Sequence, residues 1–178
     1  MKIIIASDIH GSEYYMNKLK MRFEDENAEQ LILLGDLYYH GPRNPLPKDY
    51  NPAGVAKILN SLYNDIACVK GNCDSEVDEM ISDFSFTENM QLYINNKKIF
   101  LTHGHKLDAD NLNNNFDIII YGHLHTGFIN KKDNVILVNT GSVSLPKNET
   151  KNSYVLLTDN VLELKDIDGN IIESEEIK

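Results

Sequence analysis

The sequence predicts an α/β (α+β) fold in which β-sheets pack face to face with helices on the outside. Short apolar runs recur along the chain, as expected of buried strands. Helical patterns lie between the first three of these runs. The chain after Asn89 instead has strand-like runs separated by turn signals. With 178 residues and no internal repeat, the chain has the size of a single domain, residues 1–178.

Five apolar runs predict buried strands, and two amphipathic patterns predict helices between them. The runs are rich in β-branched or large apolar residues, and the second helical pattern has the i, i+3, i+4, i+7 spacing of one helix face. The strands comprise residues 3–6, 31–34, 66–69, 99–101 and 118–121. The helices are marked by Met16, Leu19 and Phe23, and by Val55, Ile58, Leu59 and Leu62.

Turn signals divide the second half of the chain into short segments. Polar and Gly-containing residues at 95–96, 132–134 and 168–170 predict turns between strands. The Asn-rich residues 111–115 predict a loop. The second half is therefore expected to be rich in β-structure.

The charge of the chain argues against one broad class of function. The formal net charge is -10, and proteins that bind the nucleic-acid backbone use Lys and Arg to displace counterions. Duplex DNA or RNA is therefore not an expected partner, and a nuclease would need a basic track that this charge disfavours. A small phosphorylated substrate fits only if the site supplies positive charge, and metal ions are the obvious source.

The N-terminus and the cysteines indicate a cytoplasmic protein. The apolar run at residues 3–6 is followed at once by polar residues, so it is neither a signal peptide nor a membrane span. Cys68 and Cys73 do not suggest a disulfide framework and are expected to be free thiols. No membrane partner is expected.

Side chains with metal-binding chemistry follow all five apolar runs. In sheets of this kind, ligands bind in the crevice at the carboxyl ends of the strands, so five separate segments are expected to reach one site. The side chains are Asp8 and His10, Asp36, Asn72 and Asp74, His103 and His105, and His123 and His125.

Each of these residues alone has an ordinary explanation. Asp8 is equally well explained as a helix N-cap, and Asp36 or Asn72 as a turn residue. A single His103 or His123 is more often hydrogen-bonded at a strand end than bound to a metal. The joint pattern is different, because independent causes would have to place two Asp, one Asn and four His at the same end of five strands.

Mixed oxygen and imidazole donors predict a site for two metal ions. Such donors suit Mn²⁺, Fe²⁺ or Zn²⁺, whereas a thiolate-rich set would indicate structural zinc. Seven donors are too many for one ion with open positions, but two ions about 3.5–4 Å apart that share a carboxylate use all seven. The spacings Asp8-x-His10 and His123-x-His125 agree with this, because residues two apart face the same side of an extended segment.

These motifs resemble those of the calcineurin-like metallophosphoesterases. Within that family, residues 40–47 and 71–78 resemble the bacterial YfcE-type phosphodiesterases. The resemblance to these proteins covers nearly the whole chain. The motifs are Asp8-Ile9-His10, Gly35-Asp36, Gly71-Asn72-Cys73-Asp74, Thr102-His103-Gly104-His105 and Gly122-His123-Leu124-His125, followed by residues 139–146. The resemblance implies a four-layer αββα sandwich of two mixed β-sheets flanked by helices.

The resemblance also implies how the metals are held. Asp36 bridges two divalent ions, with Mn²⁺ expected and Fe, Zn, Ni or Mg as alternatives. By motif match, the other ligands are Asp8, His10 and His125 at the first ion and Asn72, His103 and His123 at the second. The chain departs from the family at Thr140, where Pro is common, and in residues 108–113, which lack the usual Gly and Pro. Neither departure is at a ligand position.

The implied activity is hydrolysis of phosphoesters, with phosphodiesters as the expected substrates. A water molecule that bridges two divalent cations is a hydroxide near neutral pH, and it is the expected nucleophile. The metals and a nearby Arg stabilise the charge that develops on the phosphate oxygens, so no covalent enzyme intermediate is needed. Asp36 and Asn72 are the expected catalytic residues at the metals.

Protonation of the leaving oxygen has more than one explanation. Many relatives have His after the Asn of this motif, but this chain has Cys73, whose thiol is a poor acid near pH 7. Cys73 is interpreted either as a catalytic residue or as a small packing residue. His105 and His40 are the imidazoles that can replace the missing acid or orient the ligands. Arg43, His40 and Asp74 are the expected substrate-binding residues, and Arg43 is suited to hold a phosphate through two hydrogen bonds.

The alternative to an enzyme is a non-catalytic scaffold or interaction protein on the same fold, as in a trafficking subunit that is related to the family and lacks a working site. The complete set of seven donors favours the enzyme. The expected partner is a small phosphoester. A homo-oligomer, either a dimer or a tetramer, is also expected, with the Pro-containing loop 38–52 as a contact surface.

Overall fold

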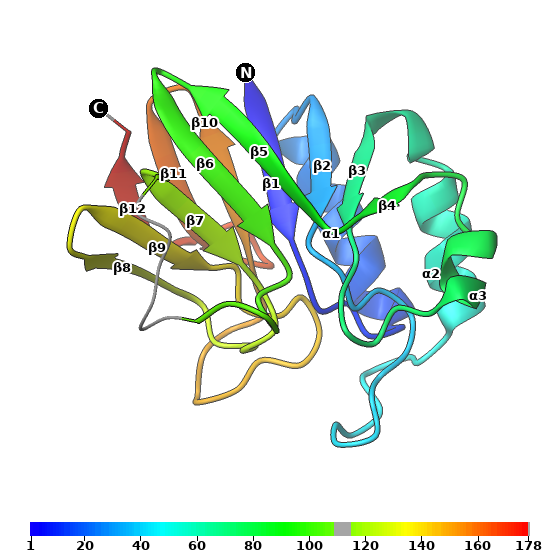
Figure 1. Ribbon diagram of the computed structural model, residues 1–178. Helices are drawn as coiled ribbons and strands as arrows, with labels where there is room; N and C mark the ends of the chain where they lie inside the picture. Colours follow the sequence, from blue (N-terminus) through cyan, green and yellow to red (C-terminus); the bar gives the residue numbers. More distant parts are fainter. Residues whose placement is uncertain (109–114, 178) are drawn as a thin grey trace.

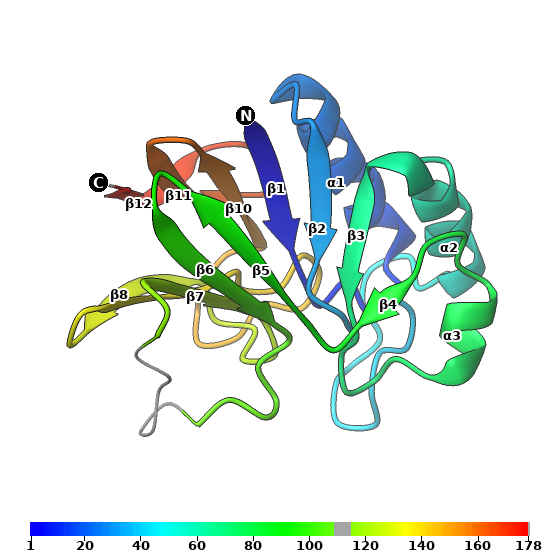
Figure 2. The same ribbon diagram turned by 45° about the horizontal axis from the view of Figure 1, so that its top comes forward.

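The computed structural model describes residues 1–108 and 115–177. They form two mixed β-sheets that pack face to face, with helices on the outer side of the larger sheet (Figures 1 and 2). The larger sheet has the strand order β12 (Ile171–Glu176), β11 (Val161–Asp166), β10 (Ser153–Thr158), β1 (Lys2–Ala6), β2 (Gln30–Leu33), β3 (Ile66–Val69) and β4 (Phe86–Thr87). The smaller sheet has the order β5 (Asn89–Ile94), β6 (Lys97–Thr102), β7 (Ile118–Tyr121), β9 (Val135–Asn139) and β8 (Phe128–Lys132).

Parallel strands in both sheets point to one edge of the molecule. In the larger sheet β1, β2 and β3 are parallel neighbours, and in the smaller sheet β6 and β7 are parallel neighbours. The arrowheads of β1, β6 and β7 point the same way (Figure 1). Strand β1 is central, because β10 pairs with its other side in the antiparallel direction, with Ile4 opposite Leu156.

Two helices cover the outer face of the larger sheet. Helix α1 (Glu13–Asp25) begins after Ser12, and α2 (Pro52–Asn60) begins after Asn51. Both preceding side chains accept a hydrogen bond from a backbone N–H in the first turn, which satisfies a donor that has no partner inside the helix. Pro52 suits the first position of α2 because its missing N–H would have had no partner there.

Helix α2 is shorter than the sequence predicts. It ends before Leu62, which lies outside the helix, although Leu62 and Ile58 are half-buried against the same core. The 3-10 turn η1 (Tyr63–Asp65) follows, and α3 (Glu76–Met80) is a single exposed helix of five residues. Sequence analysis did not predict η1 or α3.

Alternate side chains of β1 enter two different cores. Ile4 and Ala6 pack against α1 and α2, whereas Ile3 and Ile5 pack between the two sheets. Because both faces of this sheet are covered, its strands are continuous apolar runs. A smaller apolar cluster lies around Ile119 on the outer face of the smaller sheet, where the described residues include no helix.

The predicted sandwich of two mixed sheets is confirmed. The five predicted strands are present, with boundaries that differ by up to two residues, and turns lie at the three predicted positions. The predicted Asn-rich loop lies outside the described residues, apart from Asn115. No helix in the described part of the chain is long and apolar enough to span a membrane.

Candidate metal centre

Polar side chains from both sheets meet at the edge where the parallel strands end. Asp8, Asp36 and Asn72 follow β1, β2 and β3 of the larger sheet. His103 and His123 follow β6 and β7 of the smaller sheet. The structure therefore brings together the donors that were predicted from their positions after the strands.

His10 and His125 face one oxygen of Asp8. Their Nε2 atoms lie 3.5 Å and 3.2 Å from Asp8 Oδ1, and 3.2 Å from each other. All three side chains are buried. One cation can be shared by nitrogen and oxygen atoms that converge in this way.

His103 lies between Asp36 and Asn72. Its Nε2 atom is 3.4 Å from Asp36 Oδ2 and 3.0 Å from Asn72 Oδ1. Asp36 Oδ2 is also 3.8 Å from His10 Nε2, so this carboxylate faces both groups of donors. The ring of His123 lies beside that of His103, with 5.2 Å between the ring centroids. This arrangement suits a second cation next to the first.

Backbone carbonyl groups fix the orientation of three of the imidazole rings. The Nδ1 atoms of His10, His103 and His125 each lie 2.6–2.7 Å from a carbonyl oxygen. A carbonyl oxygen can only accept a hydrogen bond, so Nδ1 carries the hydrogen in each ring. In the neutral ring, Nε2 then keeps its lone pair, which is the form in which histidine binds a metal.

Asp8 Oδ1 is the one buried side-chain nitrogen or oxygen atom in the described residues that lacks a hydrogen-bond partner. The other oxygen, Oδ2, accepts hydrogen bonds from the Ser7 hydroxyl at 2.6 Å and from the His123 N–H at 2.9 Å. A buried carboxylate oxygen without a partner is costly unless a cation balances it. The donors around Asp8 Oδ1 therefore fit a divalent metal ion.

The charges in this cluster depend strongly on one another. Burial lowers the pKa of His103, but the hydrogen bond to Asp36 and the charges of Asp8 and Asp36 outweigh burial and raise this pKa to about 9. Burial raises the pKa of Asp8, yet the close imidazole rings of His10 and His125 and the charge of His103 outweigh burial and hold this pKa below its usual range. A metal cation that binds here competes with the proton of His103.

Five of the seven predicted donors have a left-handed backbone, which corrects one step of the sequence argument. The φ angle is positive, between 50° and 65°, at Asp8, His10, Asp36, His123 and His125. The pairs Asp8/His10 and His123/His125 therefore converge through tight turns, and the expected extended segments are wrong. Asp and His adopt this conformation more readily than most residues.

The loops that carry Asp36 and Asn72 pack together without space for further side chains. A Cβ atom on Gly71 would lie 2.2 Å from Asp36 Oδ1. At Gly35, where φ is 88°, a Cβ atom would lie 2.3 Å from the Gly71 nitrogen. Glycine at both positions thus allows the two loops to approach each other.

Asp74 was predicted to bind substrate, and the structure places it beneath these loops. Its carboxylate is buried and accepts hydrogen bonds from the N–H groups of Asp36, Leu37 and Gly71 at 2.8, 2.9 and 2.7 Å. Both oxygens accept from backbone donors, and Asp74 does not line the cavity next to the cluster. Asp74 instead connects the loop after β2 to the loop after β3.

An open cavity of about 550 Å³ leads to the solvent side of the cluster. We call it the Arg43 cavity, because Arg43 and Lys147 line it together with Asn72, Cys73 and His123. Asn72 is exposed and His123 is half-buried, so this is the side from which a substrate can approach. In the part of the chain that the structure describes, neither Arg43 nor Lys147 has an ion-pair partner.

The three candidate proton donors lie at different distances from the cluster. The Cys73 N–H donates to Asp36 Oδ1 at 2.8 Å, and burial raises the pKa of the Cys73 thiol to about 12. The exposed ring of His105 lies next to His103, with 5.4 Å between centroids. His40 packs against two tyrosine rings and does not line the Arg43 cavity, so its predicted contact with substrate is not seen.

Residues at the end of β9 and directly after it support the site in ways that were not predicted from the sequence. The Ser142 hydroxyl donates to the carbonyl oxygen of Asp8 at 2.7 Å, and the Asn139 amide donates to that of Gly122 at 2.6 Å. Lys147 follows a few residues later and lines the Arg43 cavity. The available signal was the family-like segment 139–146, to which no roles were assigned.

Comparison with known proteins agrees with this architecture. The family model of the calcineurin-like phosphoesterase superfamily domain matches residues 1–160. The chain belongs to this superfamily. The phosphoesterase is 41% identical over 165 residues to Phosphodiesterase YfcE of Escherichia coli (strain K12), which covers 91% of this chain and 90% of that protein. The predicted likeness to the YfcE-type proteins is confirmed.

Other comparisons extend the fold to more distant proteins. The solved structure of the E. coli phosphoesterase YfcE superposes with a TM-score of 0.94 at 39% identity, over 100% of both chains. The phosphoesterase is 29% identical to Phosphodiesterase MJ0936 of Methanocaldococcus jannaschii, over 79% of this chain and 83% of that protein. Vps29 of Entamoeba histolytica, solved with Zn²⁺, has a TM-score of 0.63 at 20% identity over 99% and 98% of the chains, so it shares the fold alone.

Proposed function

We propose that this phosphoesterase hydrolyses phosphodiesters with two divalent metal ions, expected to be Mn²⁺. The observation that carries the proposal is Asp8 Oδ1, a buried oxygen without a partner that faces the Nε2 atoms of His10 and His125. The relatives named YfcE and MJ0936 are phosphodiesterases, which supports the same activity here. The proposed ligands are Asp8, His10 and His125 at one ion, Asn72, His103 and His123 at the other, and Asp36 between them.

The residues of the chain supply orientation and charge in this proposal. When bound, the metal pair lowers the pKa of a water molecule, so that hydroxide is available to attack phosphorus. The fixed tautomers of His10, His103 and His125 keep their Nε2 lone pairs directed into the cluster. Arg43 and Lys147 provide positive charge on the solvent side, where a phosphoester enters and where negative charge increases during the reaction.

Metal stoichiometry and hydrolysis together test the proposal. The protein is depleted with EDTA and reloaded with Mn²⁺, and bound metal is then counted by elemental analysis. Two ions per chain are expected, together with hydrolysis of bis(4-nitrophenyl) phosphate that depends on the metal. One ion or fewer after loading would contradict the two-metal site, and two bound ions without hydrolysis would favour the scaffold.

Three finer expectations remain predictions. Mn²⁺ as the native metal is tested by elemental analysis of protein purified without added metal. A cytoplasmic location is tested by cell fractionation. A dimer or tetramer is tested by light scattering, where the mass of a single chain would contradict it.

A further inference from the structure

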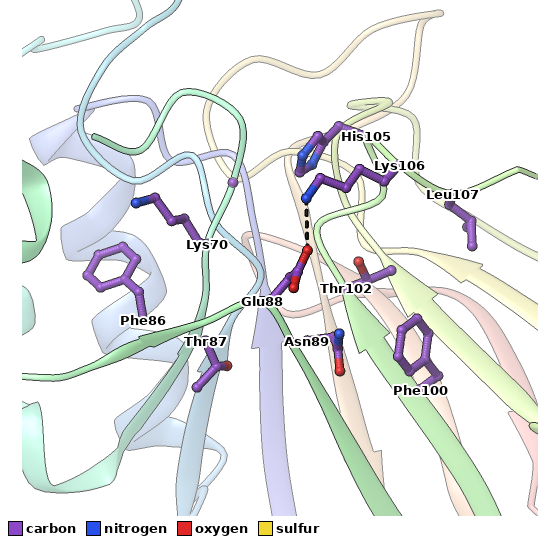
Figure 3. Close-up of a pocket in the computed structure, with 11 residues that line it drawn as sticks. Lys70, Phe86, Thr87, Glu88, Asn89, Phe100, Thr102, His105, Lys106 and Leu107 are labelled. Atoms are coloured by element: carbon purple, nitrogen blue, oxygen red, sulfur yellow. Dashed lines mark hydrogen bonds and ion pairs between the residues drawn. The ribbon is translucent and has the colours of Figure 1, made fainter. Parts of the chain in front are cut away.

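A second cavity, of about 540 Å³, lies close to the candidate metal centre, and Figure 3 shows the residues that line it. We call it the Phe86 cavity, and it begins at Gly71 and His105. Gly71 directly precedes Asn72, which lines the Arg43 cavity, and the ring of His105 lies 5.4 Å from that of His103. The Arg43 cavity therefore includes Asn72 itself, and the Phe86 cavity lies next to Asn72 and His103.

Two aromatic rings form opposite walls of the Phe86 cavity. Phe86 comes from β4 of the larger sheet and Phe100 from β6 of the smaller sheet, and they lie on opposite sides in Figure 3. Phe86 stacks on Phe84 with 5.6 Å between centroids, and Phe100 stacks on Phe116 with 4.8 Å. The second ring behind each wall holds it in place, so the cavity has two supported aromatic surfaces.

Two polar side chains lie between these walls. Asn89 of β5 and Thr102 of β6 are direct cross-strand neighbours, and both line the cavity. Their side chains make no hydrogen bond within the described residues. The amide of Asn89 and the hydroxyl of Thr102 can each donate and accept, so they are free to pair with polar groups on a ligand.

The cations of the Phe86 cavity are already neutralised. Lys106 forms an ion pair with Glu88 at 2.8 Å, drawn as a dashed line in Figure 3, and Lys70 forms one with Glu79. The Arg43 cavity differs, because Arg43 and Lys147 have no such partners in the described part of the chain. An anionic group is thus favoured on the Arg43 side, and an uncharged group on the Phe86 side.

We propose that the Phe86 cavity binds one of the two ester groups of a phosphodiester substrate, and that this group is a neutral ring with a hydrogen-bonding edge, as in a nucleoside. The proposal rests on the proposed function, because a phosphorus atom at the metal centre places its two organic groups on either side. The volume is within the range of small-molecule sites. The aromatic walls provide stacking, and Asn89 and Thr102 provide hydrogen bonds.

Three diesters with a shared leaving group test the proposal. Methyl, benzyl and thymidine 5′ esters of 2,2,2-trifluoroethyl phosphate all release trifluoroethanol, which is followed by ¹⁹F NMR. The benzyl and thymidine esters are expected to exceed the methyl ester in kcat/KM by about tenfold or more, mainly through KM, because stacking contributes about this much. The thymidine ester is expected to exceed the benzyl ester through its hydrogen bonds. Equal kcat/KM values for the benzyl and thymidine esters would overturn the proposal that the bound ring has a hydrogen-bonding edge.

Asn89→Trp tests whether the preference for ring-bearing esters over the methyl ester comes from the Phe86 cavity. The indole fills the cavity from β5, so the ratio of ring-bearing to methyl esters is expected to fall to about one. The matched control is Tyr93→Trp, which places the same indole on the same strand at a position that is 67% exposed and outside the cavity. An unchanged ratio in Asn89→Trp would overturn the proposal. Phe86→Ala, which removes the opposite wall, gives the same test if Asn89→Trp does not fold.

A binding measurement separates this proposal from the proposed function. No hydrolysis of any diester by the Mn²⁺-loaded protein would contradict the function. The cavity is then tested by titrating ¹⁵N-labelled protein with thymidine. Shifts of the Asn89 and Thr102 amide signals are expected, with a smaller shift of the Thr102 signal in Asn89→Trp. Unshifted signals at saturating thymidine would overturn the cavity as a ring-binding site.

Discussion

Asp36 faces both groups of imidazole nitrogens from a left-handed backbone that Asn also adopts readily. Asp36→Asn therefore removes the bridging charge while it keeps the shape of the loop. We expect kcat/KM for bis(4-nitrophenyl) phosphate to fall about 10³-fold, which corresponds to several kcal/mol of lost stabilisation. The thermal midpoint of the metal-free protein is expected to change little.

Asp49→Asn is the matched control for this substitution. Asp49 also has a positive φ, 49°, but it is exposed and lies outside the cluster of donors. This variant is expected to retain wild-type activity and metal content. Wild-type turnover in Asp36→Asn would show that the bridging assignment is wrong.

Cys73 is the residue where leaving-group chemistry can be tested. Its N–H bonds to Asp36, and its raised pKa, about 12, leaves the thiol protonated but a weak acid near neutral pH. Cys73→His is expected to raise kcat/KM for alkyl diesters, with 10²–10⁴-fold as the approximate ceiling for general acid catalysis. Activated nitrophenyl esters should gain little, because their leaving groups need no proton.

The pH dependence separates acid catalysis from a change in packing. The gain in Cys73→His should decrease as pH rises through the pKa of the new imidazole, because only the protonated form donates a proton. The measurement is kcat/KM for alkyl and nitrophenyl diesters in both proteins across pH. Equal changes for both types of ester would identify Cys73 as a packing residue.

The clustering of the candidate site residues could be predicted from the sequence, but their geometry could not. Donors such as Asp8 and His125 were found because five strand ends carry the same kind of chemistry. The left-handed turns were missed because Asp and His are compatible with several backbone conformations. The backbone contacts of Asp74 were not predicted, because a carboxylate near Asn72 has the same sequence pattern whether it faces a substrate or backbone N–H groups.

At the level of elements, strands that are buried on both faces were the most predictable. β1 and β7 are uninterrupted apolar runs because side chains on both faces enter a core. β12 was implied only by the turn at 168–170, because it is an edge strand whose side chains are mostly exposed, including several Glu. α3 has no buried face, and its available signal was the capping box formed by Ser75 and Asp78.

The turn between β11 and β12 depends on Asp166. Burial raises the pKa of Asp166, but hydrogen bonds from Lys151 and from the backbone and side chain of Asn170 outweigh burial and lower this pKa to about 2. The folded pKa is below the ordinary value of 3.8, so the stabilisation is present above pH 3.8 and is lost as pH falls through about 2. Asp166→Asn is expected to lower the free energy of unfolding by about 1 kcal/mol at pH 7. The loss is no larger because solvent partly screens the exposed Lys151.

Urea unfolding between pH 7 and pH 2.5 measures this effect. The difference in free energy of unfolding between the wild type and Asp166→Asn should become smaller as pH falls below 4. Asp133→Asn, at the exposed turn between β8 and β9, is the control and should cost less than about 0.5 kcal/mol. A difference that stays constant over this pH range would mean that Asp166 stabilises the turn through shape and not through charge.

For the whole molecule, the candidate centre joins two sheets that otherwise meet through apolar side chains and through polar contacts between β8 and β12, such as the Lys131–Glu175 ion pair. Asp8, Asp36 and Asn72 belong to one sheet and His103 and His123 to the other, so bound metal ions hold the sheets together. Removal of metal with EDTA is therefore expected to lower the thermal midpoint. At a Mn²⁺ concentration of 1,000 times Kd, binding contributes about 4 kcal/mol, or roughly 10 °C for a chain of this size.

Asp8→Asn tests whether that stabilisation comes from the candidate centre. It replaces the carboxylate whose Oδ1 has no partner, so the Mn²⁺-dependent increase in thermal midpoint should become much smaller. Differential scanning calorimetry with and without Mn²⁺ measures this increase. The same increase in Asp8→Asn and in the wild type would show that Mn²⁺ stabilises the protein from a different place.

The central position of β1 sets the order of events during synthesis. β1 leaves the ribosome first, yet its antiparallel neighbour β10 (Ser153–Thr158) is among the last strands to be made. At about 5–20 residues per second, one edge of β1 stays unpaired for roughly 8–30 s. Asp8 follows that strand, so the segment before this donor lacks one of its two neighbouring strands until β10 has formed. A nascent chain therefore passes through a stage in which an apolar strand edge is open to pairing with other chains.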